Sequence, residues 1–452
     1  MRNHRIPSRP HLQGDSAPLR LRHSARKLTD GGGLVLLRRL WDRWNLGGWL
    51  DERTTDLPGR YRPSLMVEVW TALLLYGGGW LDDLKLLAAR GVRRAFGWAA
   101  VPDPTTFGRW LRRAGPKMVS LLDELLWRLV RARWTEAGVP EAVTLALDST
   151  VRVRYGAKQA GAEHGYNPKK PGRPSHHPLL AFVVETGDCL GVRWRPGSAW
   201  SGAGATEWLP ELVGRLRAAG VEEITVRLDK GFFAKDVVRC LQRLEVSYLL
   251  KVPNHGVVRD QLRSWRRSTR AEGIFEDATS VWTSSGTLWG GRLLSLEGRR
   301  PLAEADGTLE LDTHEVTDTA HVLTDRQGIH ALTAWRAYNR GAAVEGHIKE
   351  LRQLSVGQTA VDDLDGNALL WQLGALAYQM LHGIRTLGLS GAWRTATPDR
   401  LRNWLFRLPG RFTDHARKRY LQLRGDGPLR GRLLEALRRI ARLRGPPLAA
   451  AG

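Results

Sequence analysis

Two aspartates stand where apolar, β-rich segments of the chain end. The segment "TLALDST" contains Asp148, and "TVRLDKG" contains Asp229. In open sheets flanked by helices, ligands bind beyond the carboxyl ends of the strands, so two parallel neighbouring strands would bring both carboxylates into one crevice. A turn or a helix cap is the simpler interpretation of either aspartate taken alone, and only the pair favours a site.

A carboxylate pair of this kind suits divalent metal ions. Two ionised carboxylates repel each other unless a cation lies between them, and hard oxygen ligands favour Mg²⁺ or Mn²⁺. Two such ions can stabilise both the attacking and the leaving oxygen of a phosphoryl transfer, but they require a third carboxylate from another element. The segment "AYNRGAAVEGHIKELRQL" offers Glu345 for this role.

The segment around Glu345 has helical spacing. Tyr338, Glu345 and Arg352 follow one another in steps of seven residues, so they share one face of a continuous helix expected from about Leu332 to Leu354. Lys349 lies near that face. One helix would then carry a metal ligand and basic phosphate contacts. A solvent-exposed helix with a Glu345–Lys349 ion pair is the alternative, and it is favoured when this segment is judged alone.

The elements that must position these residues predict an α/β fold with a mixed sheet. Strands alternate with helices on both sides of a polar segment that contains short β-like stretches. Five regions follow: a basic flexible arm, 1–30; a helical DNA-binding domain, 31–140; the catalytic domain, 141–253 and 321–360; a β-rich insertion, 254–320; and a basic helical C-terminal region, 361–452.

The segment "VPDPTTFGRWLRR" predicts a turn followed by a helix within the N-terminal helical region. Thr105 or Thr106 would cap this helix, and arginines would lie along it. A helix-turn-helix-like reader of DNA ends and an ordinary amphipathic helix with a solvated basic face explain the pattern equally well.

The overall charge favours a nucleic-acid partner. The 452 residues include 69 Lys and Arg against 46 Asp and Glu, a net charge of +23. Only two cysteines occur, which excludes a disulfide framework and predicts a reducing, cytoplasmic compartment. No apolar run reaches the roughly 18 residues of a membrane span, and the polar first thirty residues do not predict a secretory signal.

A basic loop follows the first aspartate. The segment "YNPKKPGRPSHH" contains Lys169, Lys170 and Arg173, which would contact the DNA backbone near the metal ions. Lys230, directly after the second aspartate, is a further candidate for a phosphate contact. A Pro- and Gly-rich hairpin loop and a solvated lysine are the corresponding alternatives.

These segments together resemble the DDE transposases of bacterial insertion sequences. The order "LALDST", "VRLDKGFF" and "YNRGAAVEGHIKELR" is similar to the branch with a Y-x2-R-x3-E-x6-K signature. "YNPKKPGRPSHHPLLAF" resembles the loop and strand after the first aspartate of that branch, and "FRLPGRF" followed by "ARKR" resembles its basic tail. The resemblance covers roughly residues 28–445.

The resemblance implies an RNase H-like catalytic domain in which Asp148, Asp229 and Glu345 hold two Mg²⁺ ions. It implies an enzyme that cleaves the inverted-repeat ends of an insertion sequence and joins the 3′ ends to target DNA. A homodimer bringing two ends of double-stranded DNA together, in the bacterial cytoplasm and associated with the nucleoid, is implied as well.

One position departs from the signature. Tyr338 falls on the signature Tyr and Arg352 on the signature Lys, but Gly341 takes the place of the signature Arg. The neighbouring Arg340 points about 100° away on a regular helix, unless the helix begins after Gly341 and lets it turn inward. This departure leaves open the rival hypothesis of a domesticated, non-catalytic DNA-binding protein. An RNase H-like nuclease that cuts DNA without joining it is a second rival.

Overall fold

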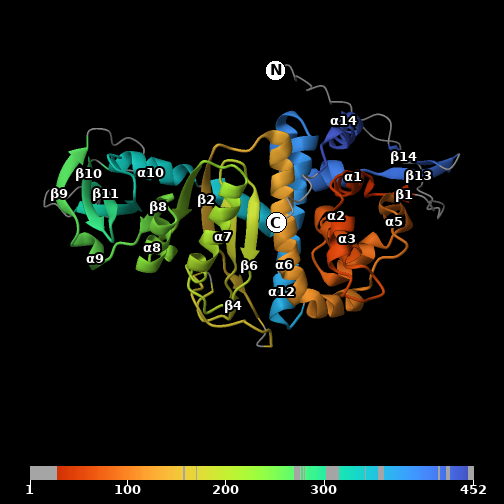
Figure 1. Cartoon of the computed structure of the whole chain (residues 1–452), viewed down its shortest axis with the longest axis horizontal. Helices are drawn as coiled ribbons and strands as arrows, with labels where there is room; N and C mark the ends of the chain where they lie inside the picture. Colours follow the sequence, from red (N-terminus) through yellow and green to blue (C-terminus); the bar gives the residue numbers. More distant parts are fainter. Residues whose placement is uncertain are drawn as a thin grey trace, which may run out of the picture.

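A large mixed β-sheet forms one half of the computed structural model, on the left in Figure 1. The structure describes residues 28–155, 158–168, 170–268, 275, 278, 280–301, 315–341, 343–354, 361–415, 418–423 and 428–445. Within these residues the sheet has nine strands in the order β6-β5-β2-β7-β8-β12-β11-β10-β9. The strands are β2 (Ala142–Ser149), β5 (Leu179–Val183), β6 (Cys189–Arg193), β7 (Glu223–Leu228), β8 (Ser247–Val252), β9 (Arg263–Ser268), β10 (Ser280–Leu288), β11 (Gly291–Pro301) and β12 (Glu315–Thr324).

Strands β2, β7 and β8 are parallel neighbours, and the other strand pairs of the sheet are antiparallel. Parallel strands need a crossover connection, and helices α7 (Ala205–Ala218) and α8 (Lys235–Arg243) provide it. The mixed α/β class predicted from the sequence is therefore confirmed.

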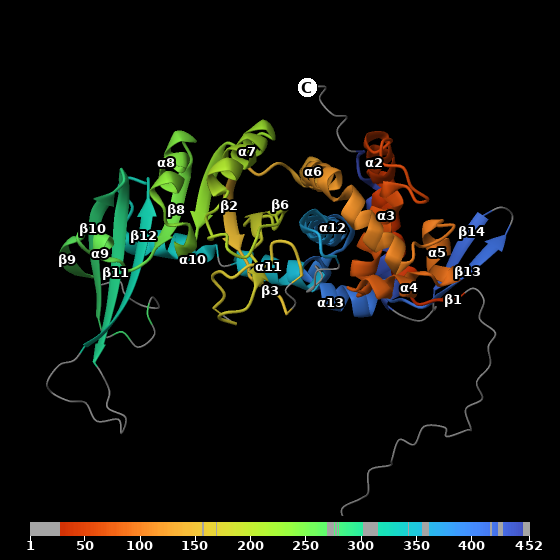
Figure 2. The same cartoon turned by 90° about the horizontal axis from the view of Figure 1, so that it is seen from below.

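Successive side chains of β7 point alternately to the two faces of the sheet. Ile224, Val226 and Leu228 are buried in the core that α7 and α8 cover. The intervening Thr225 and Arg227 point to the opposite face, where α10 (Ala331–Arg340) packs against β8, β11 and β12. Helix α11 (Ala343–Leu354) continues along that second face (Figure 2).

The segment predicted as a β-rich insertion extends the large mixed sheet. Strands β9 to β12 form an antiparallel series, and β12 pairs with β8 from His321 to Thr324. The predicted return to the sheet at "HEVTDTAHVLTDR" is confirmed by this pairing. A short helix, α9 (Gly256–Arg259), precedes the series.

Two long helices, α6 (Pro104–Ala137) and α12 (Leu364–Gly383), lie side by side between the sheet and the N-terminal helices (Figure 1). They approach closely at Gly115, where a Cβ atom would lie 2.8 Å from the Asp365 carbonyl carbon. The predicted cap of α6 is wrong, because the Asp103 side chain accepts the hydrogen bond from the Thr106 amide. Asp is as effective an N-cap as Ser or Thr.

The two ends of the described chain meet. Strand β1 (Leu28–Thr29) pairs with β13 (Gly410–His415), which pairs with β14 (Lys418–Leu423), as Figure 2 shows. This hairpin lies in the region predicted as helical. The predicted C-terminal helix content is still present in α12, α13 (Pro398–Leu401) and α14 (Pro428–Arg442), and α14 packs on α1.

The remaining elements are short or lie in the N-terminal helical part. A two-stranded sheet of β3 (Arg152–Val153) and β4 (Ser175–His176) lies in the loop after β2. The N-terminal helices are α1 (Val35–Arg43), α2 (Leu46–Arg53), α3 (Pro63–Tyr76), α4 (Leu84–Leu87) and α5 (Arg90–Phe96). The 3-10 and π segments are Gly32–Leu34, Leu81–Asp83, Lys230–Phe232, Ile384–Gly388, Gly391–Thr395 and Arg402–Phe406.

Membrane-spanning helices were sought over the described ranges. No single helix there has the length and apolar character to cross a bilayer, and only α3 taken with the bent segment Leu81–Leu87 would pass by length and composition.

Candidate active site

Asp148 lies in strand β2, and Asp229 directly follows the adjacent parallel strand β7, at the same level of the sheet. Ala146 of β2 pairs with Arg227 of β7, and each aspartate follows its paired residue by two positions. Side chains two residues apart on a strand point to the same face, so both carboxylates face the side that α10 and α11 occupy. Lys251 of β8 lies at this level too, because Arg227 pairs with Leu249 two positions earlier.

The two carboxylates are partly buried and influence each other. Burial, and after it the charge of the neighbouring Asp229, raise the pKa of Asp148 to about 7. Burial also raises the pKa of Asp229, although its side chain accepts a 2.9 Å hydrogen bond from the Gly231 amide. Two carboxylates that resist ionisation together provide the hard oxygen donors that a divalent cation favours.

Glu345 lies in the first turn of α11, and its side chain is exposed. The pKa of the Tyr338 phenol is raised to about 12, mainly by burial, which the charge of Arg227 opposes and the charges of Asp229, Asp148 and Glu345 reinforce. The negative charges of all three acids therefore act on the Tyr338 hydroxyl. Across the described ranges, however, no three His, Cys, Asp or Glu side chains come close enough to hold one metal ion. The arrangement pairs two predicted ligands and leaves Glu345 outside a closed cluster.

The continuous helix predicted over Leu332–Leu354 is wrong. Helix α10 ends at Arg340 and α11 begins at Ala343. At the break, the Gly341 amide donates to the Tyr338 carbonyl, three residues back, instead of continuing the four-residue pattern of an α-helix. Tyr338 and Glu345 consequently do not share one uninterrupted helical face.

Comparison with known proteins identifies the family. The pattern described as transposase DDE domain group 1 matches residues 12–445. The chain belongs to this transposase family. The large mixed sheet flanked by helices that was expected for the transposase is present in its structure.

One solved structure similar to the transposase is a piggyBac transposase in a synaptic complex with hairpin DNA, determined by electron cryo-microscopy. The TM-score is 0.39 at 11% sequence identity, over 83% of this chain and 79% of that chain. A search of curated proteins gave no match.

The predicted DNA contacts of the transposase divide into two groups. Arg352, on α11, is exposed and its charge lowers the pKa of Asp148, which places it near the aspartate pair. Lys230 is exposed beside Asp229, and its charge acts on that carboxyl. Of the other described candidates, Arg340, Lys349, Lys170 and Arg173 are exposed and Tyr338 is buried, whereas Lys169 lies outside the described residues.

Two basic residues near the aspartates were missed by the sequence analysis. Arg227 lowers the pKa of both Asp148 and Asp229, and Lys251 lowers that of Asp229. The Lys251 Nζ atom lies 5.2 Å from the Trp335 ring centroid and 5.9 Å from that of Tyr338. The two-residue alternation in "TVRLDKG" was the available signal for Arg227, because it places Arg227 and Asp229 on one face.

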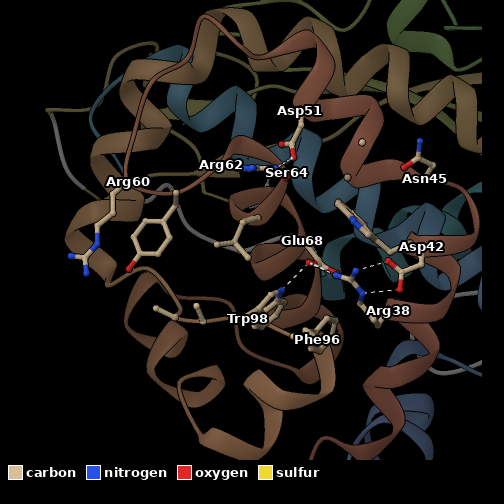
Figure 3. Close-up of a pocket in the computed structure, with 18 residues that line it drawn as sticks. Arg38, Asp42, Asn45, Asp51, Arg60, Arg62, Ser64, Glu68, Phe96 and Trp98 are labelled. Atoms are coloured by element: carbon tan, nitrogen blue, oxygen red, sulfur yellow. Dashed lines mark hydrogen bonds and ion pairs between the residues drawn. The ribbon is translucent and has the colours of Figure 1, made fainter. Parts of the chain in front are cut away.

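A cavity of about 760 Å³ lies elsewhere, in the N-terminal helical part of the transposase (Figure 3). Its lining residues fall between Arg38 and Ala100, so no sheet residue contributes. The buried Glu68 carboxylate accepts hydrogen bonds from Arg38 at 2.9 Å and Trp98 at 2.8 Å. The Glu68 carboxylate is thus already hydrogen-bonded to neighbouring side chains, and the aspartate pair remains the better candidate for metal binding and catalysis.

Proposed function

We propose that this transposase cleaves the ends of a mobile DNA element and joins the freed 3′ ends to target DNA. The observation that supports the proposal most directly is that Asp148 and Asp229 each lie two residues beyond the last paired residues of the parallel strands β2 and β7, in a chain of this family. The net charge of +23 favours DNA as the partner.

Asp148 and Asp229 would hold divalent metal, Mg²⁺ or Mn²⁺, because their oxygens are hard ligands and their mutual repulsion is relieved by a cation. A bound divalent ion supplies Lewis-acid stabilisation of charge on the phosphate oxygens. Arg227, Lys251 and Arg352 surround the pair with positive charge suited to the DNA strand. We propose that Glu345 becomes the third ligand, which requires α11 to move when DNA and metal bind.

The test is cleavage of a labelled duplex that carries the inverted repeat flanking the coding region. Asp148→Asn, Asp229→Asn and Glu345→Gln should each lower cleavage by roughly 100-fold or more, because each removes an anionic ligand of the metal. Affinity for the duplex should survive. Asp236→Asn is a matched control, because Asp236 is exposed on α8, on the other face of the sheet. Wild-type cleavage by any of the three site variants would refute its assignment.

A second candidate is a DNA-binding protein without catalysis, and the position of Glu345 outside a closed cluster favours it. A nuclease that does not join DNA is the third. A strand-transfer assay with pre-cleaved ends separates them: joined product supports the transposase, cleavage without joining supports the nuclease, and binding without cleavage supports the non-catalytic protein. We also propose that two copies bring two ends together, which light scattering of the DNA complex would test.

A further inference from the structure

The Arg227 side chain occupies the space where a side chain at position 341 would begin. A Cβ atom at this position would lie 2.3 Å from Cδ and 2.5 Å from Nε of Arg227. The backbone of Gly341, with φ of −71° and ψ of 0°, is one that other residues adopt readily. The absence of a side chain at position 341 therefore makes room for Arg227 of β7, which lies 114 positions earlier in the chain. The turn itself does not require a glycine.

The Arg227 guanidinium is held from the helix side. Its Nε donates a 2.9 Å hydrogen bond to the Tyr338 carbonyl, and its Cζ lies 4.3 Å from the Tyr338 ring centroid. Both contacts orient the plane of the group. Within the described part of the chain, its two terminal nitrogens have no hydrogen-bond acceptor. These donors remain available to a ligand beside Asp148 and Asp229.

The signature that the chain resembles would place an arginine at position 341, and the structure has another arginine in that space. We propose that Arg227 is the phosphate-binding arginine of this site, supplied by strand β7 in place of helix α10, and that Gly341 is glycine to admit it. The inference rests on the proposed function. The ligand is a phosphodiester of the DNA strand at the aspartate pair, because a guanidinium presents paired donors that match phosphate oxygens.

A reciprocal exchange of the two positions tests the assignment. Arg227→Ala should lower cleavage by roughly 10- to 100-fold, the range expected for one charge-assisted hydrogen-bonding group. Arg227→Lys should keep part of the activity, since lysine retains the positive charge but lacks the paired N–H donors of the guanidinium group. Gly341→Arg should also lose activity, because its side chain collides with Arg227. The double variant Arg227→Ala/Gly341→Arg should recover at least about tenfold over either single variant.

A binding measurement separates phosphate contact from a structural role. End DNA with a neutral methylphosphonate at the scissile phosphate should bind wild type more weakly than normal DNA, by roughly tenfold or more. Arg227→Ala should show little difference between the two DNAs. An equal loss in wild type and Arg227→Ala would overturn the inference, as would a double variant no better than the singles.

A matched control is Arg217→Ala. The Arg217 guanidinium also donates to backbone carbonyls, those of Leu244 and Glu245, but it is exposed on α7, which covers the opposite face. The Arg217→Ala variant should cleave the DNA as fast as the wild type. Wild-type cleavage by Arg227→Ala would refute the inference alone. A wild-type chain that binds DNA without cutting would refute the proposed enzyme, and the methylphosphonate comparison would still decide the role of Arg227.

Discussion

At the scale of single residues, burial and hydrogen bonding compete to set the charge of each acid. Glu68 is buried, and its pKa is raised to about 7 because burial outweighs the bonds from Arg38 and Trp98. Asp188 is fully buried too, and burial alone would raise its pKa. Paired hydrogen bonds and the charge of Arg133 outweigh that effect and lower it. The number and the charge of the hydrogen-bond donors therefore decide whether the pKa of a buried acid is raised or lowered.

Glu68 should make the stability of the protein depend on pH. Its pKa in the folded protein, about 7, lies above the ordinary value of 4.5 for a glutamate, so the folded state binds the proton more tightly. The stabilisation is complete below pH 4.5 and is lost as the pH rises to about 7, by up to about 1.4 kcal/mol per pH unit. Glu68→Gln should remove this dependence. Urea unfolding at pH 4.5, 6 and 7.5 measures it, and parallel pH curves for the two proteins would contradict it.

At the scale of elements, a buried polar network joins α6, the β5–β6 turn and α12. Asp188 accepts hydrogen bonds from Arg133 and Trp134 of α6 and from Gln379 of α12. Gln379 also accepts from the Cys189 amide. Three elements distant in sequence are therefore fixed around one carboxylate, which ties the edge of the sheet to the two long helices.

Removing one partner of this network should lower the stability of the fold. Arg133→Met leaves the Asp188 charge buried without its cation, which destabilises the fold by about 3–5 kcal/mol. Lys85→Met is the matched control, because Lys85 pairs with Asp82 on the surface, where the side chains are 71% and 78% exposed. Its cost should stay within about 1 kcal/mol. Chemical unfolding of both variants measures the difference, and similar losses would refute the role assigned to the network.

At the scale of the whole molecule, the protein is elongated (Figure 2), and basic residues occur throughout its sequence, in the helical and the sheet parts alike. The basic loop after β2 exposes Lys170 and Arg173. Strand β1, at the start of the described chain, pairs with the β13–β14 hairpin, and α14 packs on α1, so the N-terminal helices and the basic C-terminal region are packed together. A long DNA duplex could therefore contact several separate basic surfaces at once.

Binding of DNA should weaken steeply with salt. A protein that neutralises 6–10 phosphates loses about 10³–10⁵ in affinity between 50 and 200 mM salt, through release of counterions. Lys170→Glu/Arg173→Glu should lower the slope of log K against log salt by about two. Lys235→Glu, exposed on α8 on the other face of the sheet, should change it less. Titrations with labelled duplex measure the slope, and an affinity independent of salt would exclude the proposed DNA surface.

Local patterns in the sequence predicted the elements that carry the aspartates. The apolar runs before Asp148 and Asp229 correspond to β2 and β7, because alternation and β-branched residues report directly on a half-buried strand. The parallel pairing that the site required is present. Residue spacing also indicated Glu345, but spacing assumes an unbroken helix, and Gly341 interrupts it.

The sequence by itself determined the acids, the strands that end at them and the excess of positive charge, since these depend on residue type and local periodicity. Only the tertiary structure decided that Arg227 fills the space at Gly341, because that contact joins a strand to a helix 114 positions away. It also decided that β9 to β12 extend the large mixed sheet and that β13 meets β1. Such pairings depend on which surfaces meet once the chain has packed, and no local pattern encodes them.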